Sequence, residues 1–154
     1  MFADEEALRE AMQGFEGLIG THLGVVSLDL PLISNLDAWA NIALIRQYHE
    51  NLPRAKAEAV ALGCLGRYGM EAVAYKRNPA LSHEERFCVM LLRAAAMRNA
   101  TVVIDRPFLI IPHLKEARWV CEALDIASDL YDRCYVFDYV WNKERYGMID
   151  EAES

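Results

Sequence analysis

The chain has 154 residues, of which 54% are apolar and 25% are charged. These proportions exclude a fibrous or natively disordered protein, and the length suits a single domain, residues 1–154, with its own core. A formal net charge of -7 disfavours nucleic acid as a partner, because that binding depends on neutralising phosphates.

The cysteines and the hydropathy of the chain indicate where in the cell the protein is expected. The four cysteines are well separated and form no CxxC pair, which indicates reduced thiols in a cytoplasmic protein. No apolar run approaches the roughly 20 residues that span a bilayer, and the acidic first residues are unlike a signal peptide. We therefore expect no direct membrane insertion, although the protein could lie against the inner face of a membrane.

The first part of the chain predicts a helix, a strand and an apolar loop. Residues 2–15 carry a helical stripe with Asp4 as its N-cap, and the glycines at 14, 17 and 20 then predict a loop. Residues 23–27 favour a short buried strand, because the run is apolar and is closed by Asp29 and Pro31.

A run of helices follows, and its last member has the clearest start. Ser82 and Glu85 form a capping box, in which each side chain bonds the other residue's backbone N–H. The predicted helices cover residues 37–49 (with Asp37 as N-cap), 54–65, 69–75 and 82–98.

The last third predicts two more strands around a helix. Residues 100–105 are a continuous β-prone run typical of a strand covered on both faces, and residues 134–137 are a third strand candidate. A helix is expected over residues 113–130, and residues 146–154 predict a frayed tail or a short edge piece. Helices between parallel strands imply an α/β fold, with a small parallel sheet of about three strands and an inserted helical layer.

Two motifs resemble those of the ATP-binding cassette (ABC) ATPase family. LSHEER at residues 81–86 is similar to the signature that opens a helix, and TVVIDRPF at residues 101–108 is similar to the Walker B strand. Residues 23–44 resemble the strand, Q-loop and helix of the family, most closely in the lipid and organic-solvent-resistance importer branch. Over about residues 16–140, the resemblance implies a truncated P-loop ATPase-like core, with a helical subdomain at about 37–98 and the P-loop strand missing.

The residues that the family uses for catalysis are absent or altered. No GxxxxGK[ST] motif occurs, so the backbone cradle for a triphosphate is missing. The resemblance places Leu28 at the Q-loop glutamine, His83 and Glu84 at the signature glycines, and Arg106 at the Walker B glutamate; it also puts Pro112 at the D-loop aspartate and Asp138 near the switch histidine. It therefore implies a pseudo-ATPase with no catalytic residue, not an enzyme.

Two polar residues of the family's site survive, and each has two interpretations. Ser82 is either a vestigial phosphate contact or only the N-cap of its helix. Asp105 is either a vestigial magnesium-side carboxylate or a strand-end group paired with Arg106. No metal site is expected, because the histidines show no ligand-like spacing with cysteine.

The segment after the first strand keeps its apolar character. In the family, this segment and the helical layer receive a coupling helix of a membrane permease. The resemblance therefore implies a partner groove formed by Asp29, Leu30, Leu32, Ile33 and Leu36.

These observations favour one function and leave others open. The first is a non-catalytic, cassette-derived binding or regulatory module that contacts a permease or a genuine ABC ATPase subunit and needs no cofactor. The alternative is an ATP-binding subunit that a partner carrying the P-loop completes in trans, with Mg-ATP bound. A folded product without a present partner is the third.

Removing the P-loop strand also predicts an open sheet edge. The family places its P-loop strand beside the last of the three strands, at residues 133–138 here, so that strand should lose its outer neighbour. Exposed edges are usually covered or paired. We expect the N-terminal helix, the aromatic C-terminal segment or a second copy of the chain, as a homodimer, to cover it.

Overall fold

A three-stranded parallel sheet forms the centre of the protein. The computed structural model describes residues 1–148. The strands are β1 (Leu23–Val26), β2 (Thr101–Asp105) and β3 (Arg133–Phe137), in the order β1-β2-β3. Val26 pairs with Ile104, and Ile104 pairs with Val136. The α/β class, the small parallel sheet and the predicted strand order are therefore confirmed.

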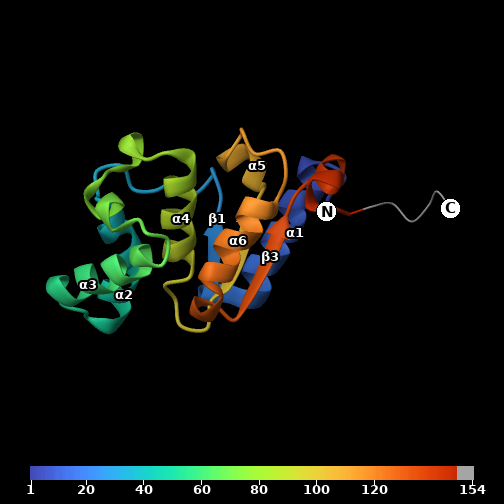
Figure 1. Ribbon diagram of the computed structural model, residues 1–154. Helices are drawn as coiled ribbons and strands as arrows, with labels where there is room; N and C mark the ends of the chain where they lie inside the picture. Colours follow the sequence, from blue (N-terminus) through green and yellow to red (C-terminus); the bar gives the residue numbers. More distant parts are fainter. Residues whose placement is uncertain (149–154) are drawn as a thin grey trace.

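Helices cover both faces of the sheet (Figure 1). On one face, α1 (Glu5–Ile19) packs Leu8 against Val103 and Phe137. On the other, α6 (Arg118–Ile126) belongs to the main core together with Val102 and Ile104. Every residue of β2 is buried, as the continuous apolar run predicts for a central strand.

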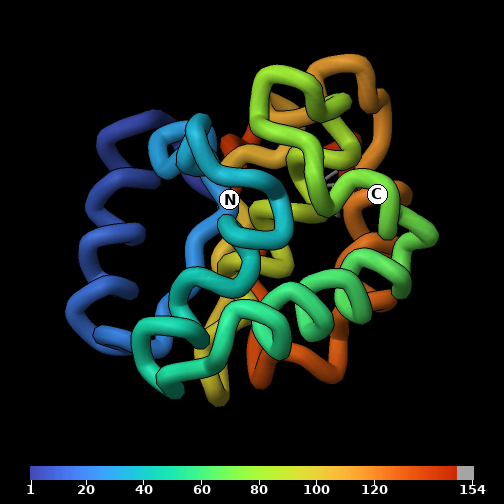
Figure 2. Tube along the Cα trace, turned by 90° about the vertical axis from the view of Figure 1, so that its left-hand side faces the viewer, coloured from blue at the N-terminus to red at the C-terminus, as the bar shows by residue number. Residues whose placement is uncertain are grey.

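The helical layer lies on the β1 side of the sheet. It consists of α2 (Ala38–Glu50), α3 (Arg54–Gly66) and α4 (His83–Ala94), with 3-10 turns η2 (Glu71–Tyr75) and η3 (Asn78–Ala80) between the last two. Figure 2, viewed from this side, shows the α2–α3 pair in front and α1 lying to one side. α4 packs against β1 and connects the layer to the sheet.

Gly24 allows this close approach between α4 and β1. A Cβ atom at Gly24 would lie 2.0 Å from the carbonyl oxygen of Ala94. No side chain fits there, so only glycine lets the last turn of α4 pack directly against the strand.

Several predicted helix boundaries are wrong. α1 continues through Gly14 and Gly17 to Ile19, and its C-cap is Gly20, where φ is +62°. α4 ends at Ala94, four residues early, and residues 69–75 contain the 3-10 turn η2 in place of an α-helix. Asp37 occupies the N-cap position of α2, but its side chain makes no capping bond and accepts one from Arg77 at 3.3 Å.

The helix predicted over residues 113–130 is shorter, since α6 begins at Arg118. The guanidinium of Arg145 donates to the carbonyl oxygens of Leu114 and Lys115, and the Ala117 N–H donates to the Arg145 carbonyl at 2.8 Å. These bonds hold the segment before α6 in an irregular conformation. The remaining short turns are η1 (Gly20–His22), α5 (Pro107–Ile110), η4 (Ser128–Leu130) and η5 (Val140–Tyr146).

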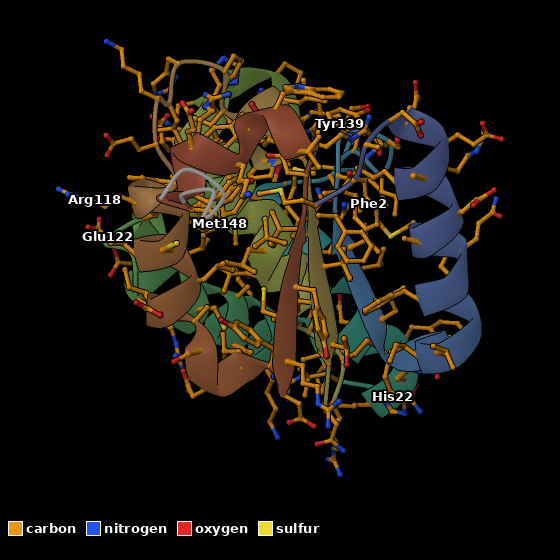
Figure 3. All side chains as sticks on the ribbon, turned by 90° about the vertical axis from the view of Figure 1, so that its right-hand side faces the viewer. Phe2, His22, Arg118, Glu122, Tyr139 and Met148 are labelled. Carbon is orange, nitrogen blue, oxygen red and sulfur yellow. The ribbon has the colours of Figure 1, made fainter. Side chains whose placement is uncertain are left out.

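The outer edge of β3 is less covered than expected. α1 covers a face of the sheet, and η5 crosses its end; within residues 1–148, only Phe2 pairs with the chain along this edge, beside Tyr139 (Figure 3). The expectation that α1 or the aromatic segment folds over the edge is therefore wrong. The predicted frayed tail falls largely on residues 149–154, which lie outside the described residues.

Candidate functional site

The carboxyl ends of the three strands meet at one end of the sheet. This is where ligands bind in open α/β folds, and it is where Asp105 stands. Ser27 follows β1, Arg106 follows β2 and Asp138 follows β3. Ser27, Asp105 and Arg106 belong to one hydrogen-bond network at this end, and Asp138 belongs to another.

The carboxylate of Asp105 is fully engaged. The Ser27 hydroxyl donates to Oδ2 at 2.6 Å, and Arg106 donates from Nε to Oδ1 at 2.8 Å and from Nη2 to Oδ2 at 3.1 Å. The side chain is only 5% exposed. Of the two interpretations above, the paired strand-end carboxylate describes the arrangement present, because both oxygens of Asp105 are bonded within the chain.

Arg106 reaches Asp105 through an unusual backbone conformation. Its φ is +47°, in the left-handed region, and its N–H donates to the Phe137 carbonyl at 2.7 Å. The guanidinium also donates to Asp29 and to the Tyr139 hydroxyl, each at 3.2 Å. Its hydrogen bond to Asp105 raises the pKa of Arg106, so a permanent positive charge occupies the position where the family resemblance implies a glutamate.

Asp138 anchors the chain after β3. Its Oδ1 accepts from the Tyr139 N–H at 2.7 Å and from Asn142 at 2.8 Å, and its Oδ2 accepts from the Tyr146 hydroxyl at 2.6 Å. Burial, and then this hydrogen bond, raise the pKa of Tyr146. The residue that aligns near the switch histidine is thus a buried structural carboxylate that shapes η5.

Ser82 lies in a different network, at the start of α4. Its hydroxyl accepts from the Glu85 N–H at 3.1 Å while Glu85 accepts from the Ser82 N–H at 3.0 Å, which confirms the capping box. The next side chain, Glu84, accepts from His113 at 2.6 Å. Among the described residues, no cluster of histidine, cysteine, aspartate and glutamate could hold a metal ion.

The segment predicted as a partner groove is exposed in part. Leu30 and Ile33 are 51% and 42% exposed, and the Asp29 side chain is exposed beside Arg106. The prediction that Leu32 lines the groove is wrong. Leu32 is only 4% exposed, so it belongs to the core and anchors the segment. Next to the half-buried Leu36, a hollow of about 300 Å³ is lined by Asn35, Leu36, Asp37, Trp39, Ala40, Gln47, Arg54 and Arg77.

Two residues that the sequence did not single out hold this segment rigid. Buried Asn41 accepts from the Ile33 N–H at 2.8 Å and donates to the carbonyl oxygens of Ile33 and Leu36 at 3.1 and 3.3 Å. Arg93 donates to the Pro31 carbonyl at 2.8 Å and to the Leu30 carbonyl, and burial lowers its pKa. From the sequence, the role of Asn41 could have been recognised only because it is a polar residue on the inner face of a predicted helix.

Three exposed apolar side chains belong to the segments that follow the three strands. Leu28 follows β1, Leu109 lies on α5 and Trp141 lies on η5, and they are 49%, 51% and 63% exposed. Trp141 stacks on Tyr139, with ring centroids 4.2 Å apart. The end of the sheet therefore presents exposed apolar side chains beside the largely buried Asp105–Arg106 ion pair.

Solved structures of ABC proteins share this fold. No protein-family profile and no curated protein matches the sequence. The dimeric bacterial ABC transporter cassette MJ0796 superposes with a TM-score of 0.59 at 20% identity, over 80% of this chain and 55% of that one. A transporter described as of the metal-chelate ABC type, in an inward-facing conformation, gives 0.57 at 13% identity, over 88% and 60%.

The chain spans little more than half the length of these structures. Within residues 1–148, no helix is long and apolar enough to cross a membrane. At these identities the likeness concerns the fold alone. The protein has part of the α/β architecture of an ABC ATPase cassette, with a three-stranded sheet at its centre.

Proposed function

We propose that this chain is a non-catalytic module, derived from an ABC ATPase cassette, that binds a transporter component at the inner face of a membrane. One observation carries the non-catalytic part: both oxygens of Asp105 are already bonded, by Ser27 and by Arg106 of the same chain. Arg106 supplies a positive charge where a general base would be needed, so the site has nothing to polarise water.

Isothermal titration with Mg-ATP tests the absence of nucleotide binding. We expect no binding tighter than about 100 μM, which is about -5.5 kcal/mol, because the phosphate cradle is absent and Asp105 is engaged. Tighter binding to the isolated chain would favour the alternative, an ATP-binding subunit that a partner carrying the P-loop completes in trans.

The segment from Asp29 to Leu36 is the proposed contact with a permease. Asn41 and Arg93 fix its backbone while Leu30 and Ile33 remain exposed, which is the arrangement of a preformed apolar docking site. The hollow beside Leu36 would receive part of the partner. A partner of this kind implies a peripheral membrane location in the cytoplasm.

Copurification from the native host tests the contact. We expect a transporter component with the wild-type chain, and a loss of at least tenfold with Ile33→Asp. Leu44→Asp on α2 is a matched control, because Leu44 is also 42% exposed. Failure to recover any transporter component, or equal recovery with both variants, would argue against the proposal.

The homodimer predicted from the open sheet edge stays a prediction. Size-exclusion chromatography with light scattering tests it, and a monomer at high concentration would exclude it. Recovery of a permease or of an intact ABC ATPase subunit with the chain would support the proposed module, and the Mg-ATP titration separates it from the alternative in trans.

A further inference from the structure

We propose that the outer edge of β3 binds an extended segment of another polypeptide, which adds to the sheet as a fourth strand parallel to β3. The inference does not rest on the proposed function, because neither the edge nor its test involves a nucleotide or a transporter.

The backbone of β3 presents unpaired groups along this edge. The Phe137 carbonyl accepts from the Arg106 N–H and the Arg133 N–H donates to the Ala100 carbonyl, at the two ends of β2, and alternation along the strand turns Tyr135 to β2 as well. The N–H and C=O groups of Cys134 and Val136 therefore point outward, and no described residue pairs with them. Strand addition uses such a row of groups.

Phe2 marks the position and the direction that a strand added at this edge would take. Its N–H donates to the Asp138 carbonyl at 2.8 Å, and its carbonyl accepts from the Val140 N–H at 2.9 Å. These two bonds form a parallel bridge with Tyr139 just beyond β3, and the Phe2 ring packs 5.0 Å from that of Phe137. A segment in line with Phe2 would run parallel to β3, with its carboxyl end beside Met1.

Figure 3 looks directly at this edge, and it shows β3 between α6 on one side and α1 on the other. On the α1 side, Tyr135 is 39% exposed and packs against Phe15 at 5.0 Å. On the α6 side, Cys134 and Val136 are half-buried against the main core. Because both walls are present, a bound strand would be covered on both faces and should be apolar on both.

Charge favours a basic partner over a second copy. The chain carries a net charge of -7, and α1 exposes Glu5, Glu6, Glu10 and Glu16 against one basic residue, Arg9. Antiparallel pairing of two β3 edges would place both α1 helices on the same face of the joined sheet, where their carboxylates repel. The expected occupant is therefore an apolar β-prone segment flanked by lysine or arginine.

The test uses the full chain and a synthetic peptide, acetyl-Lys-Val-Thr-Ile-Val-Lys-amide. In the free chain, the amide protons of Cys134 and Val136 should exchange rapidly by NMR, and saturating peptide should slow them at least tenfold. A peptide with glutamate in place of both lysines should bind at least tenfold more weakly. A nitroxide label at the carboxyl end of the peptide should broaden the signals of Phe2 and Tyr139, whereas a label at its amino end should not.

Val136→Pro is the matching protein variant, because it removes an outward N–H and leaves the ladder to β2 intact. It should abolish the protection. The proposal is overturned if the peptide does not bind, if the amino-terminal label broadens Tyr139, or if these amides are already protected in the free chain. It is also overturned if light scattering shows a dimer in which a second copy protects them.

Discussion

The two outer strands of the sheet, β1 and β3, differ in how their outer sides are covered. β1 is held by the helical layer: α4 packs directly on Gly24, Arg93 bonds the carbonyl oxygens beyond the strand, and Ser27 ties its end to Asp105 on β2. β3 has a neighbour on one side only, and along its outer edge the described residues contribute just the Phe2 bridge. Within residues 1–148, the side of the sheet toward the helical layer is therefore closely packed, whereas the outer edge of β3 is left largely unpaired.

The contrast extends to the groups at the end of the sheet and along its edge. At the end of the sheet, the buried charge of Asp105 is neutralised within the chain, since Arg106 pairs with it. At the outer edge of β3, no described residue pairs with the backbone groups of Cys134 and Val136. One side chain can pair a buried charge, whereas the ladder hydrogen bonds of an edge strand are completed by another strand, even though a helix or a loop can also cover such an edge.

The largest expected effect concerns the ion pair at the end of the sheet. Arg106→Met should lower the free energy of unfolding by about 3 kcal/mol, because it leaves the buried Asp105 carboxylate without its partner. Urea unfolding measures the loss. The double variant with Asp105→Asn should recover most of it, and the absence of any recovery would mean that Arg106 acts through its other contacts, with Asp29 and Tyr139.

The contact of β1 with α4 should be nearly as sensitive. Gly24→Ala places a methyl group on the Ala94 carbonyl and should cost at least about 2 kcal/mol in unfolding free energy. Gly17→Ala is the control, because a Cβ at Gly17 meets nothing within 4 Å and alanine favours the α1 helix. Similar urea midpoints for both variants would show that α4 can move away from β1.

A pair of proline variants contrasts the two sides of β3. Tyr135→Pro removes an N–H that bonds to β2 and should cost about 2 kcal/mol, whereas Val136→Pro removes an outward N–H and should cost under about 1 kcal/mol. Thermal unfolding followed by circular dichroism compares them. Equal destabilisation would mean that the outward groups of β3 are paired after all.

The predictable part of the fold rests on local patterns. The capping box at Ser82 needs only four residues, and the buried run at β2 needs five, so both could be read from the sequence. Strand order followed from the family resemblance. The end of α1 could not be predicted, because Gly14 and Gly17 are tolerated in a helix whose apolar face packs on the sheet. Likewise, the start of α6 depends on Arg145, about 30 residues away.

The candidate site was likewise predictable from the sequence only where the contacts are local. Pairing of Asp105 with Arg106 was an open alternative, since the two are adjacent. The contributions of Ser27, Asp29 and Tyr139 to that network come from the ends of other strands and had no local signal. The burial of Leu32 within an otherwise exposed segment also depends on the packing of distant helices.

The smallest expected effect is the pH dependence of stability that two buried thiols cause, one on α4 beside β1 and one on β3. Burial raises the pKa of Cys88 on α4 to about 12 and that of Cys134 on β3 to about 11, from 9.0. Since the unfolded chain loses these protons first, both thiols stabilise the fold fully below pH 9, and this contribution falls as the pH rises toward the folded pKa values. For Cys88 the loss should approach about 1.4 kcal/mol per pH unit above pH 9. Urea unfolding between pH 8 and pH 10 measures it, and Cys88→Ala should flatten the slope. A slope unchanged in that variant would mean that the Cys88 thiol is not the titrating group, whereas a further decrease on adding Cys134→Ala would assign the remainder to the β3 side.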